Sequence, residues 1–208
     1  MVLNAGPGHD PARWGTPADL LAVGLGNPGA EYEATRHNVG AETVALLASR
    51  HGLRLKRGKE RSLVAEARVG GRLLALAVPL TFMNESGSAV TRLVRRHGIE
   101  ALTSLVVVHD ELDLPVGRVK VKVGGGLAGH NGLKSIKAHL HDDGFVRVRI
   151  GIGKPPGRQS GADFVLRRPG QADRAALDVA VQEAADAVET ILLEGPSTAM
   201  NRYNVAVP

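Results

Sequence analysis

The run 104–109, in the middle of the chain, is the most apolar strand-like segment of the sequence. Four of its six residues are Leu or Val, and no polar residue alternates with them. A strand of this kind has no solvent-facing side, so we expect it to lie inside a sheet that is covered on both faces. The run therefore predicts a layered fold in which helices pack on two sides of a sheet.

Other short runs predict the rest of this sheet and its helices. Residues 63–69 and 72–78 are joined by Gly70-Gly71, which predicts a β-hairpin with a primed turn. Apolar or alternating runs predict further strands over 20–25, 118–123 and 146–150. Apolar residues at helical spacing predict helices over 39–50, 86–97, 131–141 and 172–193. Because these elements are interleaved and the hairpin is antiparallel, we predict a single-domain, three-layer α/β/α fold with a mixed, twisted central sheet.

Composition and the ends of the chain restrict its class. Residues 1–18 are rich in Gly, Pro and Ala, so we expect a disordered or loosely attached extension before one domain over residues 19–208. The chain has no cysteine, which excludes a disulfide framework, a thiolate zinc site and a cysteine nucleophile. It also lacks an apolar run of membrane-spanning length and a signal-peptide pattern, so we expect a soluble, cytoplasmic protein.

Positive charge is concentrated in about a quarter of the sequence. The net charge is +5, yet residues 114–169 hold 11 Lys or Arg against 3 Asp or Glu, a net +8. Residues 1–113 hold 13 against 12, and residues 170–208 hold 2 against 6. A solvated basic surface is the plain interpretation. The alternation of Arg118, Lys120 and Lys122 with valines favours a polyanion partner instead.

A glycine-rich turn follows the first predicted strand. The run Gly24-Leu-Gly-Asn-Pro-Gly29 has the spacing of a dinucleotide-binding loop, but such a loop opens a helix and residues 30–38 lack helical periodicity. We therefore favour a tight loop that presents Asn27 and then His37 to a cleft. The ordinary pKa of histidine, about 6.5, suits a general base near neutral pH. Asn38 is predicted to cap the helix that follows.

Two more clusters follow predicted strands. Asn84 is equally an N-cap or a site residue, and the adjacent Phe82 and Met83 either fill the core or stack on a base or side chain. The run 104–109 leads into Asp110-Glu-Leu-Asp113. These carboxylates indicate either a magnesium site or an Asp110 that accepts the Nδ1 proton of a catalytic histidine. The basic surroundings argue modestly against the metal.

A second glycine-rich loop, residues 124–132, precedes a predicted helix. It is not a P-loop, because Leu133 separates Gly132 from Lys134. Asn131 lies where a helix N-terminus points free N–H groups at an anion, so we expect the loop to attract phosphate. A flexible, solvated loop is the alternative.

Together these motifs resemble those of the bacterial peptidyl-tRNA hydrolase family. The resemblance extends from about Leu20 to Tyr203 and rests on GNPG…Y…TRHN-G, P-TFMN-SG, HDELDLP-G and GG--GHNGLKS in this order. It implies a monomeric α/β enzyme that hydrolyses the ester between a peptide and the 3′-terminal ribose of tRNA, and so recycles tRNA from peptidyl-tRNA that has dropped off the ribosome. It implies neither a cofactor nor a metal.

The resemblance also assigns roles to residues. His37 would be the general base that activates water, Asp110 would hold it in place, and Asn27 would bind the peptide or the water. The other implied binding residues are Tyr32, Phe82, Met83, Asn84, His130 and Asn131 around the peptide and the tRNA 3′ end, and Lys120, Lys122 and Arg149 on the acceptor arm.

Two other functions stay open at this point. A non-catalytic RNA-binding protein can use the same scaffold, as plant-type relatives of the family do. A nucleotide-dependent oxidoreductase would use the glycine run 24–29. Ester cleavage by a His37→Asn variant tests the first alternative, and a thermal shift with NAD or NADP tests the second.

Overall fold

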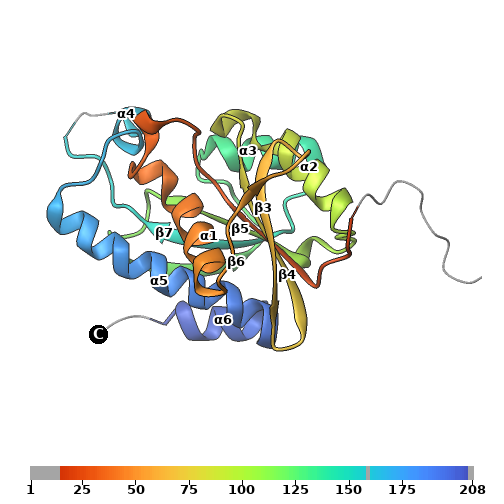
Figure 1. Ribbon diagram of the computed structural model, residues 1–208. Helices are drawn as coiled ribbons and strands as arrows, with labels where there is room; N and C mark the ends of the chain where they lie inside the picture. The colour runs from red at the N-terminus through yellow and green to blue at the C-terminus, as the bar shows by residue number, and fades with distance from the viewer. Residues whose placement is uncertain (1–14, 158–159, 206–208) are drawn as a thin grey trace, which may run out of the picture.

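The computed structural model describes residues 15–157 and 160–205 and shows one sheet with helices on both faces (Figure 1). The strands lie in the order β2-β3-β4-β1-β5-β7-β6. Strands β4, β1, β5 and β7 are parallel to one another, whereas β2, β3 and β6 join by antiparallel pairing. Their bounds are β1 Leu20–Gly24, β2 Lys56–Arg57, β3 Ser62–Val69, β4 Arg72–Pro79, β5 Leu105–Glu111, β6 Val119–Val123 and β7 Val146–Gly151.

Two groups of helices cover this sheet. On one face lie α1 (Val39–Arg50), α5 (Gln171–Glu194) and α6 (Pro196–Tyr203); on the other lie α2 (Ser86–Arg96) and α3 (Asn131–Leu140). The central strand β5 supplies both cores, because Val106 and Val108 belong to the first and Leu105 and Val107 to the second. The predicted three-layer α/β/α fold with a mixed sheet is confirmed.

The hairpin of β3 and β4 follows the prediction from Gly70-Gly71. Val69 pairs with Arg72, so the two glycines alone form the turn. Both have positive φ, 56° and 81°, as a type I′ turn requires at its two central positions. The local sequence thus sets the register of this part of the sheet.

The glycines after β1 bring a helix against the sheet. A Cβ on Gly24 would lie 2.2 Å from the carbonyl oxygen of Gly40, and a Cβ on Gly40 would lie 2.2 Å from that of Val108. Helix α1 therefore contacts the ends of β1 and β5 through backbone atoms. It begins only at Val39, well after the glycines, which confirms that the run is not built as a dinucleotide loop.

The edge strand β6 is closed by the end of the chain. The Asn204 side chain accepts the N–H of Val121 at 2.9 Å and donates to the carbonyl of the same residue at 2.8 Å. Arg118 donates to the carbonyl of Tyr203 at 3.3 Å. The side-chain amide takes the place that a neighbouring strand would otherwise occupy.

The N-terminal segment is described only from residue 15. Most of the extension expected over residues 1–18 lies outside the described residues, but Ala18 donates its N–H to the carbonyl of His97 at 2.9 Å. Among the described residues, no helix combines the length and the apolar character that crossing a membrane requires.

We expect Gly40→Ala to lower the free energy of unfolding by roughly 1–3 kcal/mol, because the added methyl collides with backbone that cannot rotate away. Urea denaturation measures this change. Gly126→Ala is the matched control, since nothing lies within 4 Å of its Cβ position. An equal loss in both variants would contradict the close approach of α1.

Candidate functional site

Polar side chains gather where the parallel strands end. Strand β1 leads into Asn27, β4 leads into the segment 82–84, and β5 carries Asp110 in its last residues. Because these strands are parallel neighbours, their carboxyl ends share one edge of the sheet. The short helix η2 (Arg36–Asn38), just before α1, adds His37 to the same edge. Motifs far apart in sequence thus meet here.

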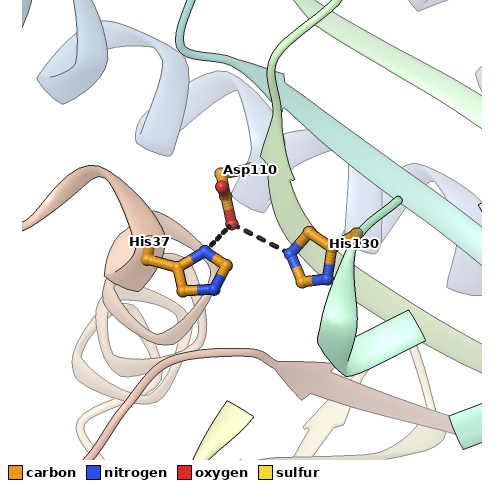
Figure 2. Close-up of side chains that lie close together, drawn as sticks. All are labelled: His37, Asp110 and His130. Carbon is orange, nitrogen blue, oxygen red and sulfur yellow. Dashed lines mark hydrogen bonds and ion pairs between the residues drawn. The ribbon is translucent and has the colours of Figure 1, made fainter. Parts of the chain in front are cut away.

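His37, Asp110 and His130 form one hydrogen-bonded group at this edge (Figure 2). The Asp110 Oδ1 atom lies 2.8 Å from His37 Nδ1 and 3.0 Å from His130 Nε2. His37 is 8% exposed and Asp110 is 3% exposed, so water competes little for these contacts. The expected contact between His37 and Asp110 is present. His130 makes a second contact with the same oxygen, which the sequence did not indicate.

The protons of both imidazoles follow from their partners. His130 is the N-cap residue of α3, and its Nδ1 accepts the N–H groups of Gly132 at 3.1 Å and Leu133 at 3.4 Å. The His130 proton therefore resides on Nε2, which donates to Asp110. His37 likewise donates Nδ1–H to the carboxylate. Its Nε2 is left as an acceptor, on the side of the ring away from Asp110 (Figure 2).

The carboxyl of Asp110 is kept ionised by its two neighbours. Burial alone would raise the pKa of Asp110, but His37 and His130 outweigh it and hold that pKa well below its usual range. The carboxylate therefore only accepts hydrogen bonds at neutral pH, and it fixes the orientation of both rings.

His109 lies beside this group and carries a neutral ring at neutral pH. Its Nδ1–H donates to the carbonyl of Asp110 at 2.7 Å, and its ring centroid lies 4.9 Å from that of His130. Burial first, and then the proximity of His130, lowers the pKa of His109 to about 3. His109 therefore places no positive charge behind Asp110 at neutral pH.

Asn27 is held by two neighbours. Its Oδ1 accepts the N–H of Met83 at 2.8 Å, which assigns its Nδ2 as the end that is free to donate. Asn38 clamps the backbone of Asn27: its Oδ1 accepts the Asn27 N–H at 2.9 Å and its Nδ2 donates to the Asn27 carbonyl at 3.0 Å. Asn38 is the N-cap residue of α1, as predicted, but its side chain forms no cap hydrogen bond, because this clamp occupies it.

A cavity of about 420 Å³ opens in front of this group. It includes six of the twelve expected site residues: its lining is Asn27, His37, Phe82, Met83, Asn84, Asn131, Ala162, Val165 and Leu166. Tyr32 stands at its margin, edge-on to Phe82 with 6.4 Å between ring centroids. Asn84 lines the cavity rather than capping α2, whose N-cap residue is Glu85.

One wall of the cavity was missed by the sequence interpretation. Helix α4 (Gly161–Val165) and the residue after it, Leu166, supply apolar side chains. Arg36 fixes this segment: its guanidinium lies 4.2 Å from the Phe164 ring centroid, donates to the carbonyl of Arg167 and pairs with Asp173 at 3.0 Å. No local motif marks these residues, because only the folded chain brings them beside His37.

The geometry does not favour a metal ion at this group. The ligand atoms of His37, Asp110 and His130 do lie within 4.8 Å of one another. However, a metal on His130 Nε2 would move the proton to Nδ1, which already accepts two backbone N–H groups. Donors would then face donors at the start of α3. The group fits proton transfer better than metal binding.

The magnesium alternative after β5 is wrong, because its carboxylates diverge. Glu111 faces Arg149 at 3.6 Å, while Asp113 is exposed and pairs with Lys154 at 3.2 Å. Asp110 points at the two histidines instead. The three acids share no common centre.

The glycine loop differs from the phosphate loop that we expected. Gly132 and Leu133 direct their N–H groups to His130, so they are not free for an anion. Arg147 is 1% exposed and donates to the carbonyls of residues 124, 125 and 126. The buried guanidinium of Arg147 thus holds the loop in place.

Three cations form the expected basic face beside this loop. In the antiparallel register of β6 and β7, Lys120 lies opposite Arg149, and Lys122 lies opposite Arg147. Lys122 is exposed, and Lys120 and Arg149 are half-buried. Arg147 does not belong to this face, although it alternates with the valines of β7 as Arg149 does, because the loop 124–126 covers it.

Known proteins are similar to this chain in sequence and in fold. The sequence profile of the family described as peptidyl-tRNA hydrolase matches residues 21–208. A peptidyl-tRNA hydrolase of Frankia casuarinae is 48% identical over 88% of this chain and 93% of its own length, and one of Nocardia farcinica is 49% identical over 88% and 95%. The crystal structure of peptidyl-tRNA hydrolase from Acinetobacter baumannii superimposes with a TM-score of 0.84 at 36% identity, covering 91% of this chain and 96% of that one.

We expect the lowered pKa of His109 to make stability depend on pH. Between pH 6.5 and 3 the unfolded chain protonates this imidazole and the folded chain does not, so the free energy of unfolding falls as pH falls. One such proton contributes a slope of about 1.4 kcal/mol per pH unit. Urea denaturation at pH 4.5, 5.5 and 6.5 should therefore give a flatter profile for His109→Gln than for the unchanged chain. Parallel profiles would contradict a neutral, buried His109.

Proposed function

The chain belongs to the peptidyl-tRNA hydrolase family, and from this we propose that it hydrolyses the ester between a peptide and the 3′-terminal ribose of tRNA. The observation that carries the proposal is the His37 imidazole, whose Nδ1–H is bound to Asp110 while the ring lines the cavity. A ring held in this way presents one unprotonated nitrogen to whatever enters. That is the requirement for activating water.

The reaction follows from the positions of these atoms. His37 Nε2 takes a proton from a water molecule as the water oxygen attacks the ester carbonyl. Asp110 stabilises the positive charge that develops on the imidazole. When the tetrahedral intermediate collapses, the imidazolium returns this proton to the departing ribose oxygen. Free tRNA and a peptide with a new carboxyl group are the products.

Asn27 is the residue that we assign to the reacting group. Its Oδ1 is engaged by Met83, so its Nδ2 is the end available to donate to the substrate carbonyl or to the developing oxyanion. The Asn38 clamp keeps this donor in place. His130 positions Asp110 from the opposite side and does not itself touch the substrate in this scheme.

The cavity separates two parts of the substrate. We assign the peptide and the terminal nucleotide to the surface formed by Tyr32, Phe82, Met83, Asn84 and Asn131. Phe82 is 52% exposed, as a stacking partner must be before its ligand arrives. The acceptor arm of the tRNA then lies on the basic face of Lys120, Lys122 and Arg149, where phosphate contacts hold it without reading its sequence.

We propose that the protein acts as a monomer in the cytoplasm, without a cofactor or metal. The His37–Asp110 pair supplies a general base without a metal ion. The non-catalytic RNA-binding alternative is less favoured, because it leaves the hydrogen-bonded histidine at the cavity without a purpose.

We expect His37→Asn to lower the rate of ester cleavage by roughly 10²–10⁴-fold, because it removes the general base. The measurement is release of an N-blocked amino acid from tRNA, with and without a chelator. A chelator should leave the wild-type rate unchanged.

His141→Asn is the matched control for this experiment. His141 is exposed and has a φ of 56°, a conformation that asparagine adopts readily. It should retain wild-type activity. Near-normal cleavage by His37→Asn would instead support the RNA-binding alternative.

We expect Lys122→Ala to weaken tRNA binding and to flatten the salt dependence of the affinity by roughly one phosphate contact. Lys122 is exposed on the basic face, and its side chain forms no hydrogen bond or ion pair with any residue in the described part of the chain. Binding of uncharged tRNA between 50 and 200 mM salt measures the slope. An unchanged slope would place the acceptor arm elsewhere.

A further inference from the structure

A second basic surface lies at the opposite edge of the sheet. The segment 54–61, which contains β2, has five Lys or Arg among eight residues and one acid. All five of these cations are exposed, and so are two arginines of α2. We call this set the β2 surface; its members are Arg54, Lys56, Arg57, Lys59, Arg61, Arg92 and Arg95.

The acids near the β2 surface do not neutralise it. Glu60 is 8% exposed and pairs with Arg96 at 2.8 Å, below the surface. Glu85 pairs with Arg61 at 3.5 Å. The other six cations form no ion pair with any residue in the described part of the chain. Uncompensated charges of one sign repel each other, and a polyanion relieves this repulsion.

Contacts between α2 and residues 60–61 join the two elements that carry the β2 surface. Arg96 binds Glu60, and Arg61 donates to the Ser88 hydroxyl at 3.4 Å. Arg92 lies one helical turn from both Ser88 and Arg96, so it occupies the same side of the helix. The two elements that carry the β2 surface are therefore fixed to each other at these contacts.

The position of this patch separates it from the acceptor-arm face. β2 and β6 are the two edges of a seven-stranded sheet. Steps of about 4.8 Å between strands place these edges roughly 29 Å apart. The cavity lies between them, at the ends of β1, β4 and β5. An acceptor arm that runs from the cavity over β6 and β7 leads away from β2.

We propose that the β2 surface binds the phosphate backbone of a second RNA segment, separate from the acceptor arm of the tRNA substrate. Only the placement of that arm rests on the proposed function. Arginine is the main cation here, five of seven, and its fork of N–H donors suits phosphate. RNA is favoured over a lipid surface because none of the large exposed apolar side chains of the described residues lies on the segment 54–61 or on α2.

Two multiple variants test this proposal. The first, Arg54→Gln/Lys56→Gln/Arg57→Gln/Lys59→Gln, neutralises the β2 surface; the second, Lys120→Gln/Lys122→Gln, neutralises two cations of the acceptor-arm face. Each is assayed for binding of a 16-base-pair RNA duplex without a 3′ overhang from 50 to 200 mM salt, for binding to anionic lipid vesicles, and for cleavage of N-blocked aminoacyl-tRNA.

The proposal predicts opposite results for the two variants. Neutralising the β2 surface should reduce the slope of log Kd against log salt for the duplex by about two to three, while kcat/KM for cleavage stays within about twofold of wild type. The acceptor-arm variant should lose kcat/KM and retain a steep duplex slope. Arg92→Gln/Arg95→Gln, on a different element, should reduce the duplex slope as well, which guards against misfolding of the first variant.

Three outcomes would overturn it. An unchanged duplex slope in both β2-surface variants would make the patch a solvated face. A loss of kcat/KM equal to that of the acceptor-arm variant would mean that the substrate tRNA itself occupies it. Loss of binding to anionic lipid vesicles with duplex binding intact would indicate a lipid surface. Absence of cleavage by the wild-type enzyme would refute the proposed function alone, because duplex binding is read independently.

Discussion

The site depends on one carboxylate oxygen that two imidazoles share. Asp110 sits in the last residues of a fully buried strand, so its position is set by the packing of both cores. From there it binds His37, which precedes α1, and His130, which begins α3. These helices lie on opposite faces of the sheet. A single hydrogen-bond acceptor therefore ties the two outer layers to the middle one at the point where chemistry is proposed.

Small residues make this convergence possible. The backbone contacts of Gly24 and Gly40 let α1 start directly over the strand ends, and Gly26 leaves space for the Asn38 carboxamide, which a Cβ would approach within 3.1 Å. The same glycine spacing that resembles a nucleotide loop thus has a packing purpose. It brings the helix close enough for His37 to reach Asp110 and for Asn38 to reach Asn27.

The sequence predicted those features whose cause is local. Gly70-Gly71 specified its turn, and alternation specified β6 and β7. The contact between His37 and Asp110 was implied by the resemblance to the family. Asn38 does lie at the predicted N-cap position, but its side chain binds the backbone of Asn27, because one carboxamide cannot cap the helix and clamp this loop together. Arg147 has the pattern of a surface residue, and the loop that buries it is distant in sequence. The β2 surface was not predicted from the sequence, because acids elsewhere in residues 1–113 offset its positive charge in the net charge of that region.

The closure of β6 by Asn204 makes completion of the sheet depend on a residue that is translated after every strand of the sheet. Until the chain beyond α6 has left the ribosome, this strand presents unpaired backbone groups to any other extended chain nearby. The vulnerable interval ends when Asn204 docks on β6. Shortened forms that stop before this asparagine would keep an unpaired edge strand next to the cationic face of the molecule. Self-association through this strand would also cover the cationic face.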